Sequence, residues 1–150
     1  MRTTVFHWYE TYSTGIFRFA LSILKDPQLA EDVLQETFLR LLSRGSLPDP
    51  GKAQAWLYKV AKNLCMDHLR RQKREQPLLS QPAADSREDW EFIRLIAPLN
   101  RTEQQILSLR FIGGLTHKEI AQVLGLTVHG SKKRYERAIE KLRNEMEEIP

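Results

Sequence analysis

The sequence predicts an all-α protein of two small helical domains joined by a short linker, the second domain containing a helix-turn-helix. Apolar residues recur at steps of three and four along most of the chain, the spacing of helices that bury one side. Start and stop signals built from Asp, Asn, Thr, Pro and Gly divide this pattern into separate helices. The stretch Glu75–Asp85 has two prolines and no apolar period, and it predicts the linker. We therefore assign residues 1–75 to the first domain, 76–86 to the linker and 87–150 to the second.

Composition narrows the class of protein further. The 150 residues carry a formal net charge of +4, which favours anionic partners. A single cysteine, Cys65, excludes an intramolecular disulfide framework, so nothing points to an oxidising compartment. The N-terminus lacks a signal peptide pattern and no apolar run is long enough for a membrane span, so we expect a cytoplasmic protein without membrane insertion.

An enzyme is not expected. The chain has no Gly-rich phosphate loop, no nucleophile elbow and no paired carboxylates in a predicted pocket. Its four histidines are scattered without metal-ligand spacing. We predict no catalytic residue, no metal, no cofactor and no small-molecule substrate.

The first domain begins with two predicted helices. An aromatic-rich helix spans Val5–Lys25, and Asp26 then caps a second helix, Pro27–Arg44, which has proline at its first position. Gly45 is expected to end the second helix as a left-handed C-cap.

The second helix carries acidic and amide side chains near its start, at Glu31, Asp32, Gln35 and Glu36. Acids in the first turns of a helix suit its dipole without any further role. The alternative is that this acidic, partly apolar surface docks a basic partner protein.

A long helix over Ala53–Arg74 is predicted to carry two stripes after the proline-containing loop Ser46–Gly51. The apolar stripe consists of Ala53, Trp56, Leu57, Val60, Ala61, Leu64 and Cys65. The basic stripe consists of Lys59, Lys62, Met66, Arg70 and Lys73, with Asn63 beside it.

The charge of this region is nearly unbalanced. From Lys52 to Arg74 there are seven Lys or Arg residues against one acid, Asp67. An ordinary solvated helix face interleaves both signs, so nucleic acid is the favoured partner, and a solvated basic face remains the simpler alternative.

The second domain is predicted to hold four helices. They span Arg87–Ala97, Arg101–Ile112, His117–Leu124 and Val128 to about Met146. Three capping-box signatures mark helix starts, namely Ser86 with Asp89, Asn100 with Glu103 and Thr116 with Glu119. The last two helices meet at a short turn containing Gly125, and the final helix is basic, so the pair predicts a DNA-binding helix-turn-helix.

Three segments in order extend this prediction to a family. DVLQETFLRLL (32–42), AWLYKVAKNLCMDHLRRQKR (55–74) and LTHKEIAQVLGL with RAIEKLR (115–126, 137–143) resemble bacterial RNA polymerase sigma factors of the extracytoplasmic-function (ECF) group. The resemblance covers nearly the whole chain. It implies a transcription initiation factor whose partners are core RNA polymerase and promoter DNA, with an anti-sigma factor as a further candidate partner.

The resemblance also assigns roles to residues. Contacts to the minus-35 element, read as duplex, would come from Thr127, His129, Ser131, Lys132, Lys133, Arg134 and Arg137. Contacts to the melted minus-10 element would come from Lys52, Lys59, Lys62, Asn63, Arg70 and Arg71. Docking on the polymerase would use Asp32, Gln35 and Glu36.

Other functions stay open at this point. One is a stand-alone helix-turn-helix regulator that dimerises through its first domain. Another is a sigma-like protein that cannot initiate alone, since the linker is short and Gly130-Ser131 stands where the family usually has Thr-Val. A recombinase would need a catalytic domain, which residues 1–75 do not suggest.

Overall fold

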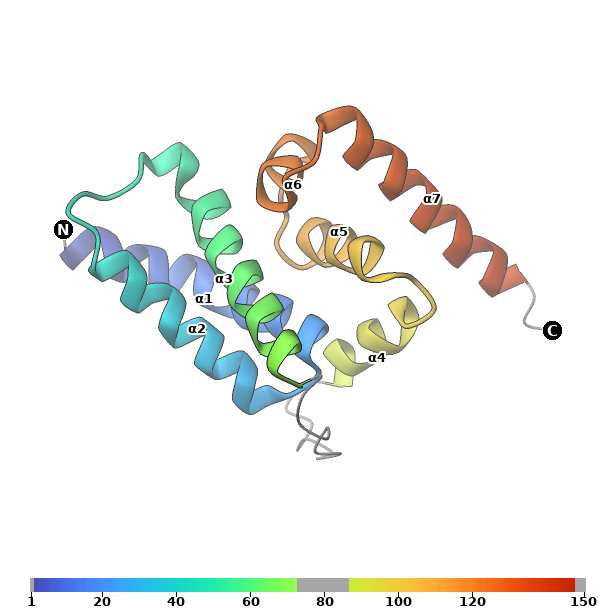
Figure 1. The fold of residues 1–150 in the computed structure, drawn as a ribbon, viewed down its shortest axis with the longest axis horizontal. Coiled ribbons are helices and arrows are strands. Elements are labelled where there is room, and N and C mark those ends of the chain that lie inside the picture. The colour runs from blue at the N-terminus through green and yellow to red at the C-terminus, as the bar shows by residue number, and fades with distance from the viewer. Residues whose placement is uncertain (1, 73–86, 148–150) are drawn as a thin grey trace.

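The computed structural model describes residues 2–72 and 87–147, and within them it confirms the all-α prediction. Helices make up every regular element of these residues (Figure 1). The first three are α1 (Arg2–Leu24), α2 (Pro27–Leu42) and α3 (Pro50–Gln72). The others are α4 (Arg87–Ile96), α5 (Arg101–Phe111), α6 (His117–Leu124) and α7 (Val128–Glu147). The predicted linker lies outside the described residues, as do Lys73, Arg74 and Ser86.

Helices α1, α2 and α3 pack on one another and bury a shared core. Phe19, Leu41 and Leu57 lie at its centre and are fully buried. The chain reverses between α1 and α2 at Lys25, whose φ of 57° is left-handed, and Asp26 then accepts hydrogen bonds from two backbone amides of the first turn of α2. The predicted cap at this corner is confirmed.

The predicted end of α2 is wrong. The helix stops at Leu42, before Gly45, and Gly45 does not take the left-handed conformation of a glycine cap. Ser43 is the C-cap, and its hydroxyl donates to the backbone oxygen of Leu39 at 2.9 Å. A serine side chain that satisfies a free carbonyl removes the need for a left-handed residue at this end.

Helices α4 to α7 begin as the sequence predicts. Both capping boxes within the described residues are complete, at Asn100 with Glu103 and at Thr116 with Glu119. Gly125 ends α6 with a φ of 68°, which is the left-handed turn of the helix-turn-helix. Helix α7 packs across α5 and α6 and forms the outer edge of this half (Figure 1).

The two halves are packed together into one body. Helices α4 and α5 lie against α1, and α6 lies against α3. One continuous apolar cluster contains Phe19 and Tyr58 from the first half together with Ile106, Leu109 and Ile120 from the second. Helix α6 therefore lies between α3 and α7 (Figure 1).

Candidate nucleic-acid interface

The N-terminus of α7 is fixed by Thr127. Its Oγ1 accepts from the backbone amide of Gly130 at 2.9 Å, and its carbonyl accepts from the amide of Ser131, also at 2.9 Å. A Cβ at Gly130 would come within 2.9 Å of Thr127 Oγ1. Glycine at this position therefore leaves room for the cap, and α7 starts at Val128 despite the Gly130-Ser131 pair.

The basic residues of α7 project outward. Lys132, Lys133, Arg134 and Arg137 are exposed, and none forms an ion pair with another described residue. His129, next to Thr127 at the start of the helix, is exposed as well. A capped helix start with free cations along one face is the arrangement that lets a helix enter the major groove of DNA.

Ser131 faces the opposite way from these cations. It is 0% exposed, and its Oγ has no hydrogen-bond partner among the described residues. With Ala138 it lies on the buried side of α7, where Tyr135 and Leu142 of the same helix are partly buried. The prediction that Ser131 contacts DNA does not suit this position, because its hydroxyl cannot reach a groove.

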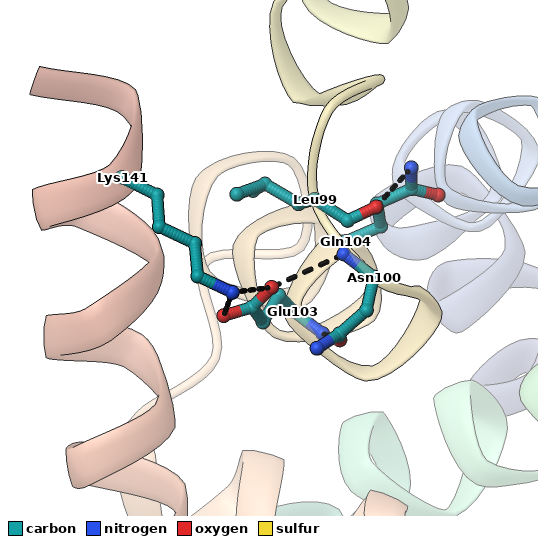
Figure 2. Close-up of polar contacts among 5 residues, drawn as sticks. All are labelled: Leu99, Asn100, Glu103, Gln104 and Lys141. Atoms are coloured by element: carbon teal, nitrogen blue, oxygen red, sulfur yellow. Dashed lines mark hydrogen bonds and ion pairs between the residues drawn. The ribbon is translucent and has the colours of Figure 1, made fainter. Parts of the chain in front are cut away.

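A carboxylate at the start of α5 holds α7 in place (Figure 2). Glu103 accepts from the backbone amide of Asn100 at 3.1 Å, which completes the capping box. The same carboxylate pairs with Lys141 of α7 at 2.9 Å, with the Glu103 side chain 5% exposed and that of Lys141 56% exposed. Beside this contact, Gln104 donates to the backbone oxygen of Leu99 at 3.0 Å. The side chain of Glu103 therefore both completes the cap of α5 and pairs with the basic helix α7.

His117, in the first turn of α6, contacts α7 nearer its N-terminal end than Glu103 does. The ring of His117 packs edge-on against Tyr135, with centroids 4.9 Å apart. Burial lowers the pKa of His117, and the nearby cations Arg110 and Lys132 lower it further, while Glu136 opposes them. A neutral imidazole at this contact adds no charge to the already cationic surface.

Helix α3 presents a second row of polar and basic side chains. Lys52, Lys59, Asn63 and Arg70 are all exposed, and their spacing of seven, four and seven residues puts them along one line of the helix. Arg70 forms a pair with Asp67 one turn earlier, yet its side chain stays 74% exposed. Exposed pairs of this kind hold side chains weakly, so Arg70 is available to a phosphate.

Lys62 is placed differently from this row. It is half-buried, and burial lowers the pKa of its ammonium, with Lys59 adding a smaller effect in the same direction. It lies four residues after Tyr58 and four before Met66, the face of α3 that meets the second half of the chain.

Arg71 does not belong to the same surface. It lines a groove between α2 and α3 together with Asp32, Gln35 and Glu36. The structure therefore separates Arg71 from the other residues predicted to meet the minus-10 element, and brings it next to those predicted to meet the polymerase.

The acidic surface of α2 is open to solvent. Asp32, Gln35 and Glu36 are exposed. Gln35 donates to Glu31 at 3.2 Å, and Glu36 pairs with Arg40 at 3.4 Å. Both contacts join residues one turn apart on the helix surface, so these side chains remain accessible to a partner.

The sequence predicts a partly apolar surface beside these residues, but not the groove that the structure forms there. Phe6, Tyr9, Leu39 and Leu42 are exposed and line a groove between α1 and α2, which Gln35 borders. A second apolar groove lies between α4, α5 and α7, lined by Leu95, Phe111, Met146 and neighbouring residues. The signal was present in helices whose apolar stripes are wider than one buried side needs.

One aromatic contact was also missed. Trp56, predicted to be core, is half-buried, and the guanidinium of Arg44 lies over its ring, 4.9 Å from the centroid. Such stacking is a common way to hold an arginine in place. Arg44 is two residues beyond the end of α2, so the contact ties the α2–α3 loop to the start of α3.

The fold and these surfaces together define a helical DNA-binding protein with a helix-turn-helix half and a second basic helix. Comparison with known families is consistent with this class. Residues 8–75 match Sigma-70 region 2, and residues 89–142 match Sigma-70 region 4.

Individual relatives agree. The chain is 28% identical over 152 residues to the ECF RNA polymerase sigma factor SigM of Bacillus subtilis, covering 93% of each chain. It is 30% identical over 135 residues to the ECF RNA polymerase sigma factor EcfG of Rhodopseudomonas palustris, covering 83% of this chain and 75% of the relative. The chain belongs to the ECF group of RNA polymerase sigma factors, which are transcription initiation factors.

Solved structures share the fold. The sigma factor RpoE in complex with the anti-sigma factor NepR from Bartonella quintana superposes with a TM-score of 0.77 at 18% identity, covering 96% of this chain and 97% of that one. CnrH in complex with the cytosolic domain of CnrY gives a TM-score of 0.78 at 22% identity, covering 100% and 92%.

Across residues 2–72 and 87–147, no three His, Cys, Asp or Glu side chains are grouped so as to hold a metal ion. In the same part of the chain, no helix has the length and apolar character required to cross a membrane.

Proposed function

We propose that the chain directs core RNA polymerase to promoters by reading the minus-35 element with α7 and holding the melted minus-10 element along α3. The observation that carries the proposal is the exposed face of α7, where Lys132, Lys133, Arg134 and Arg137 have no acidic partner among the described residues. Arginine and lysine can pair with guanine O6 and N7 in the major groove or with phosphates beside it.

Thr127 and His129 complete this surface. Both are exposed at the first turn of α7, where the positive end of the helix dipole favours a phosphate. Ser131 is left out of the proposal because it is buried.

The row of exposed polar and basic side chains on α3 suits a single strand of DNA better than a duplex. Lys52, Lys59, Asn63 and Arg70 follow one line of the helix, which matches a backbone that runs along it. Melting would then be driven by binding free energy, since no bond is made or broken by this chain.

Docking on the polymerase is proposed for α2. Asp32, Gln35 and Glu36 supply negative and polar groups, and the apolar groove of Phe6 and Leu39 adjoins them. A charged patch beside an apolar groove combines steering with buried area, the two components of a protein interface. We extend the proposal to regulation by an anti-sigma factor, as in the complexes of RpoE and CnrH, and to a cytoplasmic location.

The test is run-off transcription on a promoter library with purified core polymerase. A Lys132→Ala, Arg134→Ala, Arg137→Ala variant should lose transcripts while it still co-elutes with the polymerase. The matched control is Arg87→Ala, Arg94→Ala, Arg101→Ala, which removes the same charge from exposed positions outside α7 and should keep transcription. Loss of co-elution in the first variant would show that α7 does not have the proposed role.

The docking surface has a separate test. Asp32→Lys with Glu36→Lys should abolish co-elution and leave duplex binding intact. If the unmodified chain binds a specific duplex without polymerase and does not co-elute with it, the stand-alone regulator is correct instead. If it co-elutes but yields no transcripts, the sigma-like protein that cannot initiate alone is correct.

A further inference from the structure

Helix α2 has a groove on each side. On the side of α1 lies the apolar groove lined by Phe6, Tyr9, Leu39 and Leu42. On the side of α3 lies a second groove, called here the charged groove, whose lining includes both acidic and basic side chains. Gln35 and Leu39 line both grooves, so the two adjoin along α2. A partner that lies across α2 can therefore contact both at once.

The charged groove carries opposite charges on its two sides. Val33 and Leu64 are buried at its base. Asp32 and Glu36 line it from α2, and Arg71 lines it from α3. The carboxylates of α2 would repel a DNA phosphate, and the guanidinium of α3 would repel a purely cationic partner. The groove therefore suits a protein segment that carries charges of both signs.

The charged groups of this groove are available to such a segment. Asp32 and Arg71 are exposed, and neither forms an ion pair with another described residue although both line the same groove. Glu36 pairs with Arg40 at 3.4 Å, but the two side chains are 47% and 49% exposed. Exposed pairs of this kind are weak, so a cation of a partner can replace Arg40 at Glu36.

The phase of α3 decides which of two adjacent arginines faces this groove. Leu64, His68 and Arg71 recur at steps of four and three, so they share the side of α3 that meets α2. Arg70 does not line the groove and belongs with Asn63 to the row of exposed side chains. Successive residues of a helix are turned by about 100°, so the two arginines face different surroundings although they adjoin in the sequence.

We propose that core polymerase docks across α2 and presents a carboxylate to Arg71 and a cation to Asp32 and Glu36. This inference rests on the proposed function, because it extends the docking surface of α2 to α3 and names the chemistry of its partner. A guanidinium can bind a carboxylate through two parallel hydrogen bonds, which fixes the direction of approach. A partner docked the other way round would bring like charges together on both sides of the groove. Arg71 therefore orients the polymerase and does not hold DNA.

Two charge reversals at adjacent positions test the inference. Arg71→Glu and Arg70→Glu change the net charge equally at exposed sites, so each is the matched control for the other. Titration of core polymerase into the chain, labelled at its N-terminus and followed by fluorescence anisotropy, measures the affinity. Arg71→Glu should bind about ten-fold or more weakly, because repulsion replaces a charge-assisted contact. Arg70→Glu should stay within about two-fold of the unmodified chain, because its charge lies outside the groove.

Run-off transcription at rising concentrations of each variant gives a second readout. Arg71→Glu should need about ten-fold more chain for half of its maximal transcription, yet reach the level of the unmodified chain at saturation, because only polymerase affinity is reduced. Arg70→Glu should saturate at the ordinary concentration with fewer transcripts, because it alters the row proposed to hold the melted strand. A role of Arg71 in stability alone would not produce this opposite behaviour.

The other results each have a definite meaning. Equal polymerase affinities of the two variants would overturn the inference, because the position of the charge would then be irrelevant. Normal polymerase affinity of Arg71→Glu with transcripts lost even at saturation would overturn it too, and would make Arg71 a DNA contact. If circular dichroism shows Arg71→Glu to be unfolded, Arg71→Gln replaces it and must show the same order of affinities. In all these cases the proposed function stands; if the unmodified chain does not bind polymerase, the proposed function fails and the inference with it.

Discussion

Removal of the Glu103 carboxylate should destabilise the protein by about 1–2 kcal/mol. Glu103→Ala deletes the hydrogen bond from the Asn100 amide, worth about 0.5–1.5 kcal/mol. It also deletes the pair with Lys141, which is worth about 0.2–1 kcal/mol because that lysine is half exposed. Asn100 still caps the backbone of residue 103, so α5 should persist.

A second variant separates the two contributions. Glu103→Gln keeps an oxygen for the Asn100 amide and loses mainly the charge, so it should cost about 0.5–1 kcal/mol. Lys141→Met keeps the apolar stem and removes the ammonium. The double variant should then show a coupling free energy of about 0.2–1 kcal/mol, measured as the deviation from additivity.

Urea unfolding followed by circular dichroism measures these differences, and the melting temperature of Glu103→Ala should fall by about 2–8 °C. Glu145→Ala is the matched control, since Glu145 is an exposed acid of α7 and should change little. If Glu103→Ala unfolds like this control, or if Glu103→Gln and Lys141→Met are fully additive, the carboxylate does not hold α7 in place.

Two further predictions concern buried groups. Burial raises the pKa of the Cys65 thiol to about 12, so Ellman's reagent should react with it only as fast as the protein opens; stoichiometric reaction within seconds in native buffer would contradict this. The pKa of His117 is lowered in the folded state, so its contribution to stability is fully present above pH about 6.5 and is lost as the pH falls below that value. The unfolding free energy should therefore fall more between pH 8 and pH 5 in the unmodified protein than in His117→Gln; equal slopes would exclude His117 as the cause.

Local signals were enough to place most helices. Asn100 with Glu103 and Thr116 with Glu119 act within four residues, so their capping boxes formed as predicted. Gly45 failed as a predictor because Ser43 reaches the free carbonyl first. A side chain that competes with a glycine for the same cap cannot be ranked by composition alone.

The inward position of Ser131 could have been predicted. Ser131, Tyr135, Ala138 and Leu142 recur at steps of four, three and four, which is a buried stripe that begins with a small polar residue. The positions of the cations alone do not show this buried stripe. The contact between Arg18 and Asp89 is different, since nothing in the spacing of two residues 71 positions apart encodes their meeting.

Helix α3 presents three faces, and this decides which of its residues can test the proposed DNA contact. Leu57 and Leu64 hold it in the first half, Tyr58 and Lys62 face the second half, and Lys59 lies on the edge proposed for DNA. A substitution at Leu57 or Tyr58 would disturb packing, because both side chains are buried. Lys59 is exposed, so Lys59→Ala removes a charge from the proposed contact and leaves the packing of α3 intact. Weaker binding of single-stranded DNA by this variant, at unchanged stability, is therefore the result that the proposed role of α3 requires.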